Sequence, residues 1–196
     1  MCISQLISNP LLVTMPKIFL IRHGRAAAGW GESADPGLDA KGLEQAIQAS
    51  GAMQAMHPMP IVSSPMARAR ETAAPLAKAW GCTPEIDARF SEIPTPKHIP
   101  ANRKAWITDI LSKQWDAMDA ALQAWRESLL AAVHSLKGDT VVFTHFIAIN
   151  AIAGAAIDNG SLVVFMPDNA SITKVAVEGP AITLLEKGAE MPTLVG

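Results

Sequence analysis

Two histidines in this sequence directly follow short apolar runs. His23 comes after the run Lys17–Arg22, and His145 comes after Thr140–Thr144. Both runs are rich in β-branched residues, as expected of buried strands. In an open α/β sheet, ligands bind beyond the carboxyl ends of the strands. Imidazole groups together with Arg22 at such an edge are suited to phosphoryl transfer through a phosphohistidine.

A second basic element follows the apolar run at residues 60–63. Pro65 comes next, at a position that favours the start of a helix, and we expect this helix to reach Trp80. Free N–H groups at such a helix end favour an anion. Arg68 lies on the first turn and is expected to reach a bound phosphate. Arg70 points to a different face and is interpreted as a surface residue.

A carboxylate and a proline-rich segment complete the set. Glu92 opens the segment 93–105, which we expect to border the site as a substrate-facing lid, with a solvated loop as the alternative. Taken alone, Glu92 fits a capped loop and His145 fits a buried, hydrogen-bonded histidine. Because two histidines, two arginines and a carboxylate coincide at strand ends, phosphoryl transfer is the stronger interpretation. The basic residues of the segment are Lys97, His98, Arg103 and Lys104.

Strand-like and helix-like segments alternate along most of the chain, which is typical of an α/β fold. Strands are expected at 17–22, 60–63, 84–87, 140–144, 161–166, 171–177 and 181–185. Helices are expected at 39–56, 65–80, 115–136 and 147–157. Within the first helix, apolar residues recur at helical spacing, namely Leu43, Ala46, Ile47 and Met53.

The composition narrows the class of protein. The chain has 196 residues, with 16 Lys+Arg, 18 Asp+Glu and a formal net charge of -2. Hydrophobic residues make up 49% and charged residues 17%, which excludes a disordered chain. The near-balance of charge argues against a general nucleic-acid binder. Cys2 and Cys82 cannot form a disulfide framework, so we expect free thiols in a reducing, cytoplasmic compartment.

The length favours a single domain, which we expect to span residues 15–196. Residues 1–14 lack the charged start and cleavage site of a signal peptide. We expect them to lie outside the core, as an upstream start, a disordered extension or an ordered arm. The most apolar stretch, 141–157, is interrupted by polar residues, so a buried strand and helix explain it better than a membrane span.

In the order and spacing of its motifs, the chain resembles the histidine phosphatase superfamily, which has the phosphoglycerate-mutase-like fold. The resemblance implies a three-layer α/β/α sandwich with a mostly parallel central sheet, and it implies no metal and no organic cofactor. It also implies His23 as the phosphorylated nucleophile and Glu92 as the general acid. Arg22, Arg68 and His145 would bind the transferred phosphate. The motifs are Phe19–Gly24, Leu38–Ala46, Ser63–Ala73, Glu92 and Val142–His145.

The expected charges suit these roles. A nucleophilic imidazole must be neutral, and nearby cations lower its pKa. We expect Arg22, Arg68 and a protonated His145 to lower the pKa of His23 in this way. Burial of Glu92 would raise the pKa of its carboxyl toward the working range of a general acid.

The sequence departs from the family pattern at several positions near the site. Arg25 stands where Glu or Thr is common, and it would either recruit a second anionic group of the substrate or lie on the surface. Gly24 would let the backbone turn sharply beside a ligand. Gly29 replaces an Asn of the mutases, and Phe146-Ile147 replaces the glycine that usually follows the second histidine. Asn169 would supply a polar group to the substrate from a late loop, or simply form a turn.

The leading hypothesis is a metal-independent phosphatase that acts on a small phosphorylated metabolite or a phosphohistidine protein. Phosphate would pass to His23 and then to water, with Glu92 acting first as acid and then as base. A phosphoglycerate-type mutase is the alternative enzyme, and the short stretch between Glu92 and His145 weighs against it. A non-catalytic phospho-ligand binding module is the alternative from another class. We expect no nucleic-acid or membrane partner, and the oligomeric state stays open.

Overall fold

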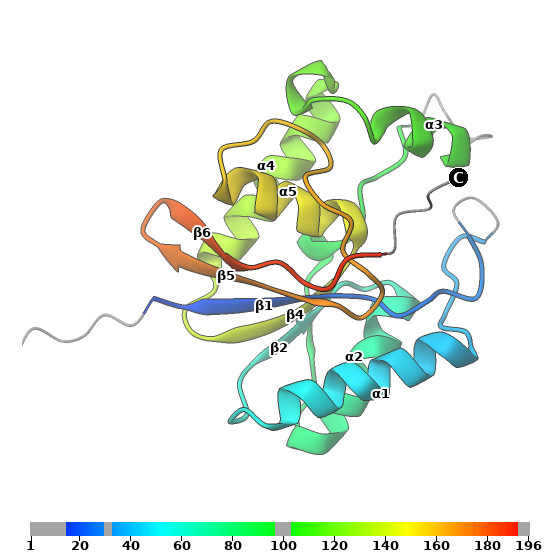
Figure 1. The fold of residues 1–196 in the computed structure, drawn as a ribbon, viewed down its shortest axis with the longest axis vertical. Coiled ribbons are helices and arrows are strands. Elements are labelled where there is room, and N and C mark those ends of the chain that lie inside the picture. The colour runs from blue at the N-terminus through cyan, green and yellow to red at the C-terminus, as the bar shows by residue number, and fades with distance from the viewer. Residues whose placement is uncertain (1–14, 30–32, 97–102, 192–196) are drawn as a thin grey trace, which may run out of the picture.

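A mixed β-sheet lies at the centre of the structure, with the strand order β3-β2-β4-β1-β5-β6 (Figure 1). This computed structural model describes residues 15–29, 33–96 and 103–191, so the expectations for residues 1–14 fall outside the described residues. The predicted strands at 17–22 and 140–144 are confirmed with the same bounds. The strands are β1 (Lys17–Arg22), β2 (Ile61–Ser63), β3 (Glu85–Ile86), β4 (Thr140–Thr144), β5 (Ile172–Glu178) and β6 (Ala181–Glu186).

The strands that precede the candidate residues run parallel and end together. β1 pairs with β4, β4 with β2 and β2 with β3 in parallel, whereas β5 and β6 add antiparallel pairs. The expected mostly parallel sheet is therefore confirmed. Arg22 of β1 lies opposite Thr144 of β4. Because parallel strands end at the same edge, His23 and His145 leave the sheet side by side.

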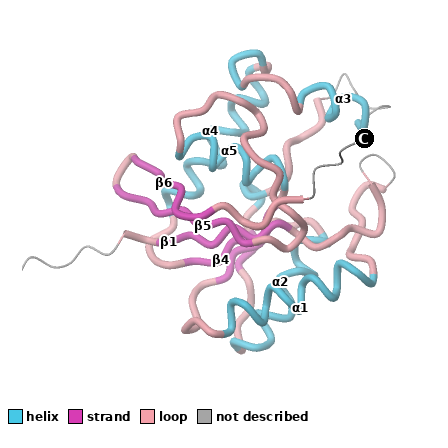
Figure 2. Tube along the Cα trace, in the orientation of Figure 1, coloured by secondary structure: helices cyan, strands magenta, loops and turns pink. Residues whose placement is uncertain are grey.

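Two helical layers cover the sheet, as expected of an α/β/α sandwich (Figures 1 and 2). The helices are α1 (Ala40–Gln54), α2 (Ala67–Trp80), α3 (Arg103–Ile110), α4 (Ala120–Ser135) and α5 (Phe146–Ala156). α1 and α2 pack on one face, and α4 and α5 on the other. Alternate residues of β1 point to opposite faces of the sheet. Phe19 and Ile21 pack in the hydrophobic core beneath α1 and α2, whereas Ile18 and Leu20 pack in the core beneath α4 and α5.

The helix expected at 115–136 is instead two elements. A short 3-10 turn spans Trp115–Ala117, and α4 begins only at Ala120. Asp119 caps α4, since its side chain accepts a hydrogen bond from the amide of Leu122. The apolar spacing alone did not reveal this interruption, because it continues across the cap.

The segment 161–166 forms no strand, so that prediction was wrong. The amides of Val164 and Phe165 donate to the side-chain oxygen of buried Asn150. These amides therefore have partners without a neighbouring strand. The sequence also missed α3, which begins at Arg103 inside the segment 93–105 that was expected to be a lid. Residues 97–102 of that segment lie outside the described part.

Two further details of the helices differ from expectation. α2 begins at Ala67 rather than at Pro65. Leu43 and Ile47 of α1 are 49% and 63% exposed, so their helical spacing did not mark a buried face. The buried face of α1 consists largely of smaller residues, which allow α1 and α2 to pack closely.

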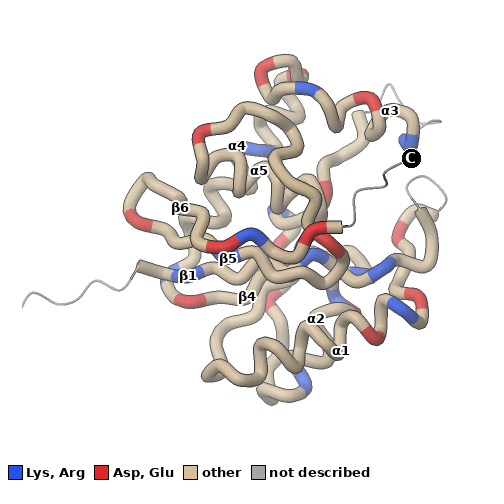
Figure 3. Tube along the Cα trace, in the orientation of Figure 1, with Lys and Arg blue, Asp and Glu red and all other residues tan. Residues whose placement is uncertain are grey.

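Charged residues of both signs are found throughout the described chain (Figure 3). Basic and acidic residues are interspersed along the trace (Figure 3). None of the described helices is both long enough and apolar enough to cross a bilayer. The apolar stretch at 141–157 consists of buried strand β4 followed by buried helix α5, as the sequence predicted.

Candidate active site

A cavity of about 1030 Å³ lies beyond the carboxyl ends of the parallel strands. Residues of the loop that follows β1 form one side, and residues 93–96 with Arg103 at the start of α3 form another. The predicted location of the site at the strand ends therefore coincides with a cavity. The candidate residues that line the cavity are Arg22, His23, Arg25, Arg68, Glu92 and Asn169.

The hydrogen bonds of His23 define its tautomer. Its Nδ1 lies 2.7 Å from the carbonyl oxygen of Gly24, and its Nε2 lies 3.2 Å from the Nε of Arg68. The guanidinium N–H can only donate, so Nε2 is the acceptor and Nδ1 carries the proton. The nitrogen that keeps its lone pair therefore faces the arginine.

The surroundings of His23 keep its imidazole neutral. Burial, followed by the positive charges of Arg68 and Arg22, lowers the pKa of His23 to about 3. The sequence predicted this direction and both arginines. It missed the largest cause, which is burial: His23 is only 7% exposed.

His145 corrects one part of that expectation. It is fully buried, and its ring centroid lies 5.2 Å from that of His23. Burial and the neighbouring His23 and arginines hold the pKa of His145 well below its usual value, so it is neutral rather than protonated. Its Nε2 lies 2.8 Å from the hydroxyl of Ser64, and its Nδ1 has no partner among the described residues.

Arg68 is the second residue of α2 and is 6% exposed. The end of α2 that precedes it was expected to offer free N–H groups, and that prediction was wrong at two positions. The amide of Ala67 donates to the carboxylate of Asp35 at 2.9 Å, and the amide of Met66 donates to the hydroxyl of Ser64 at 3.3 Å. Cationic side chains, rather than these two amides, are therefore what the site offers an anion.

The guanidinium of Arg22 is fixed by groups far away in the sequence. Its Nη1 donates to the carbonyl oxygen of Pro167 at 2.8 Å and contacts the sulfur of Met191 at 3.4 Å. The guanidinium carbon lies 5.2 Å from the centre of the Phe146 ring. Its buried Nε has no partner among the described residues. Arg22 is thus held at the cavity as a positioned cation with an unused donor.

Glu92 is buried, as its expected role requires, with 6% of its surface exposed. Its carboxyl accepts hydrogen bonds from the amides of Ile93 at 3.0 Å and Ile147 at 3.2 Å. Burial raises the pKa of Glu92, and these hydrogen bonds and the nearby arginines oppose that rise. The amide of Ile147, in the position where the family usually has a glycine after the second histidine, thus bonds to Glu92.

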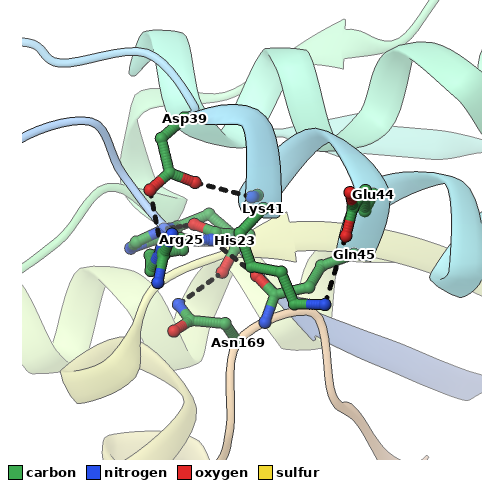
Figure 4. Close-up of polar contacts among 9 residues, drawn as sticks. His23, Arg25, Asp39, Lys41, Glu44, Gln45 and Asn169 are labelled. Carbon is green, nitrogen blue, oxygen red and sulfur yellow. Dashed lines mark hydrogen bonds and ion pairs between the residues drawn. The ribbon is translucent and has the colours of Figure 1, made fainter.

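Asn169 and Gly24, which were both expected near the substrate, have contacts within the protein itself. The amide nitrogen of Asn169 donates to the carbonyl oxygen of His23 at 3.0 Å, although Asn169 also lines the cavity (Figure 4). Gly24 is not among the described glycines with a left-handed backbone, so the expected sharp turn is not its reason. A Cβ at Gly24 would lie 2.5 Å from the carbonyl oxygen of Gly42, and Gly24 therefore permits close approach of α1.

Arg25 lies at the outer part of the cavity with a partner of its own. Its Nε forms an ion pair with a carboxylate oxygen of Asp39 at 2.6 Å (Figure 4). The other oxygen of Asp39 accepts from the amide of Gly42 and caps α1. The charge of Arg25 is thus already balanced, and its side chain is exposed, as the surface interpretation held.

Sequence reasoning missed Ser64, Asp35 and Thr72 as neighbours of the candidate residues, whereas Arg103 was expected near the site as part of the segment 93–105 and does line the cavity. Ser64 directly follows β2 and was within reach of the strand-end argument. Thr72 lies one turn after Arg68 on α2, and its hydroxyl accepts from the amide of Gly24 at 2.9 Å. The position of Arg103 depends on a helix that the sequence did not predict. Among the described residues, no three His, Cys, Asp or Glu side chains gather as metal ligands would.

Comparison with known protein families shows to which family this chain belongs. Residues 18–189 match the histidine phosphatase superfamily, branch 1. The chain belongs to this superfamily. As a member of the histidine phosphatase superfamily, it shares its fold with solved structures that cover about nine-tenths of its length. A protein described as mycobacterial hydrolase 1 has a TM-score of 0.70 at 20% identity, covering 91% of this chain and 100% of that one.

Two further structures extend the comparison of this histidine phosphatase superfamily member. A mycobacterial glucosyl-3-phosphoglycerate phosphatase complexed with VO3 has a TM-score of 0.69 at 22% identity, over 89% of this chain and 100% of that one. A phosphoglycerate mutase from Thermus thermophilus has a TM-score of 0.56 at 22% identity, over 89% and 99%. At such identities, these likenesses concern the fold alone.

The relatives found by sequence similarity align with this chain over a smaller part of their own length. A probable phosphoglycerate mutase of Citrobacter koseri is 37% identical over 86 residues, 40% of this chain and 39% of the relative. That of Salmonella paratyphi C is 29% identical over 123 residues, 59% of this chain and 50% of the relative. This histidine phosphatase superfamily member therefore aligns with half or less of these mutases.

Proposed function

We propose that this protein is a phosphatase that hydrolyses a phosphomonoester, or a phosphohistidine protein, through a phosphohistidine on His23. The observation that carries the proposal is the tautomer of His23. Its Nε2 keeps a lone pair at the cavity, 3.2 Å from a guanidinium, and its pKa is lowered to about 3. A neutral imidazole beside fixed cations is the state in which a histidine can attack a phosphoryl group.

In the first step, the Nε2 lone pair of His23 forms a bond to phosphorus as the bond from phosphorus to the ester oxygen breaks. The carboxyl of Glu92, whose pKa burial raises, gives its proton to the departing oxygen. Arg22 and Arg68 balance the charge on the phosphoryl oxygens. The proton on Nδ1 stays hydrogen-bonded to the carbonyl oxygen of Gly24, which favours the cationic ring formed by phosphorylation.

In the second step, water attacks phosphorus and the bond from phosphorus to Nε2 breaks. The Glu92 carboxylate left by the first step takes the proton of the water, and the enzyme returns to its starting state. In this account, none of the steps uses a metal or an organic cofactor. The proposed partner is the phosphorylated substrate, with no role for a nucleic acid or a membrane.

A phosphoglycerate-type mutase is the second candidate, because the relatives named above are probable phosphoglycerate mutases. The cavity has room for a large substrate, because its volume of about 1030 Å³ is at the upper end of the range for pockets that bind drug-sized ligands. Assays for interconversion of 3-phosphoglycerate and 2-phosphoglycerate with a bisphosphate primer distinguish the two candidates. A mutase interconverts them faster than it releases phosphate.

The proposal is tested by turnover of phosphomonoesters with His23→Ala and with His57→Ala, which alters an exposed histidine that does not line the cavity. We expect His23→Ala to abolish phosphate release and His57→Ala to keep it. Retained turnover in His23→Ala would exclude the proposed nucleophile. A wild-type protein that binds phosphomonoesters without turnover would instead be a binding module.

A further inference from the structure

The cavity extends well past the group of residues around His23. Its outer walls are formed by residues 26–29, 33, 34 and 36 on one side and 93–96 on the other, and most of these wall residues are alanine, proline or other small or apolar residues. Such walls suit the organic part of a ligand, whereas a few charged groups fix its orientation. Among the described residues, the charged ones that line this outer part are Arg25 and Arg103.

Arg103 is held at the cavity wall by the loop that Glu92 opens. Its Nη2 donates to the carbonyl oxygen of Ile93 at 3.2 Å, and its Nη1 donates to the hydroxyl of Thr95. The residue is half-buried, although it begins a short helix. A guanidinium that is fixed on two sides loses little further freedom when it binds a planar anion.

The charge of Arg103 has no ion-pair partner among the described residues, whereas Arg25 has one in Asp39 at 2.6 Å. Arg68 and Arg103 repel each other, since the charge of Arg103 helps to lower the pKa of Arg68. Both are attracted by the carboxyl of buried Glu92, which Arg103 therefore shares with Arg68. The cavity thus holds more fixed positive charge than a single phosphoryl group requires.

We infer that Arg103 forms a second anion subsite, and that the substrate is a phosphomonoester whose organic part carries a second anionic group, a carboxylate or a phosphate. The inference rests on the proposed function for the phosphoryl end, which would lie at His23. The organic part would lie along the small and apolar walls, and the second anion would contact the guanidinium of Arg103. Arg103 is then a specificity-determining residue rather than a participant in the chemical steps.

Equilibrium binding of phosphonates, which cannot be hydrolysed, tests this subsite without relying on turnover. Calorimetry would compare alkylphosphonates with ω-carboxyalkylphosphonates and α,ω-bisphosphonates of matched chain length. At one or more lengths, we expect the second anion to strengthen binding to the wild type about tenfold or more. The anion with the larger gain identifies the natural group.

The variants separate recognition from a structural role. We expect Arg103→Gln to reduce the gain to less than about twofold, and Arg103→Lys to keep part of it as a point charge. Lys104→Gln removes the same charge from an exposed neighbour and should keep the full gain. If Arg103 only holds the loop at Ile93 and Thr95, its loss weakens all phosphonates equally and the gain persists, which overturns the inference.

Failure of this inference and failure of the proposed function give different results. A wild-type protein that gains nothing from a second anion at any chain length overturns the inference, even where phosphomonoesters are hydrolysed. A protein that shows the Arg103-dependent gain but never releases phosphate overturns the proposed function and leaves the subsite standing.

Discussion

The Nε of Arg68 donates a hydrogen bond to the Nε2 of His23 across 3.2 Å. The same nitrogen would form the bond to phosphorus in the proposed reaction. Before attack, the guanidinium must therefore release Nε2 and turn its N–H groups toward the phosphoryl oxygens. Arg68 would thus fix the tautomer of the free enzyme and then stabilise the transition state from the same position.

Replacing Arg68 by Lys tests this double use. The ammonium keeps the positive charge but loses the planar set of donors. Loss of one well-placed donor to a developing anion typically costs about 10²–10³-fold in kcat, and we expect a loss of this size. Arg70→Lys, on an exposed site of the same helix, is the matched control and should keep kcat. Equal kcat in Arg68→Lys and the wild type would contradict the role.

The dependence of the rate on pH should follow Glu92 on the alkaline side. The first step needs a protonated carboxyl, so the rate with phenyl phosphate should fall as pH rises through the raised pKa of Glu92. His23, with its pKa at about 3, should stay neutral and impose no acid limb above about pH 4. The pH profile of single-turnover phosphorylation measures both limits.

Glu92→Gln should remove the alkaline limb of the pH profile. The loss of rate that it causes should depend on the leaving group of the ester. We expect single-turnover phosphorylation by phenyl phosphate to slow by about 10²–10⁴-fold, because its leaving oxygen needs a proton. With 2,4-dinitrophenyl phosphate, whose leaving group departs as an anion, the loss should be below about tenfold. An equal loss with both esters would show that Glu92 is not the acid.

Ser64 should orient His145 through the 2.8 Å contact between its hydroxyl and Nε2. Ser63→Ala is the matched control, since Ser63 is equally buried and its hydroxyl donates to the carbonyl oxygen of Ser64 at 2.9 Å. Each substitution should cost about 1–3 kcal/mol of unfolding free energy, because it leaves a buried polar group without its partner. Only Ser64→Ala should also lower kcat, by about tenfold, which corresponds to about 1.4 kcal/mol. Equal kcat values for both variants would assign Ser64 to stability alone.

Gly24 should tolerate no side chain, because a Cβ would lie 2.5 Å from the carbonyl oxygen of Gly42. We expect Gly24→Ala to lower the unfolding free energy by about 1–3 kcal/mol, measured by urea denaturation, as overpacked sites do. Gly51 is the control: it lies within α1 with nothing near its absent Cβ, and Gly51→Ala should stabilise the helix by about 0.8–1 kcal/mol. If Gly24→Ala matched Gly51→Ala, the close approach would not constrain the fold.

Local patterns in the sequence predicted the strands and helices that carry the site. The apolar runs at 17–22 and 140–144 are buried strands because each stretch is apolar by itself. Because each histidine directly follows one of these strands, His23 and His145 could be expected at the same edge of the sheet before the strand order was known. The capping residue Asp119 escaped the same reasoning, because a single polar residue between two apolar stretches does not interrupt the helical spacing.

Tertiary contacts determined what the sequence could not reveal. Asp35 reaches the amide of Ala67 across 32 residues, so the expected anion site at α2 already has a carboxylate. The neutral state of His145 depends on complete burial, which its neighbours in the sequence do not specify. Arg103 faces the cavity only because α3 forms beyond the proline-rich segment.

The most direct test of the central claim is to trap the phosphorylated protein during turnover. The wild type would be mixed with an activated phosphomonoester, quenched in alkali to preserve phosphohistidine, and mapped by peptide mass spectrometry. The account predicts phosphate on His23, formed within the first turnover and absent in His23→Ala. Turnover without a phosphorylated intermediate, or with the phosphate on another residue, would contradict it.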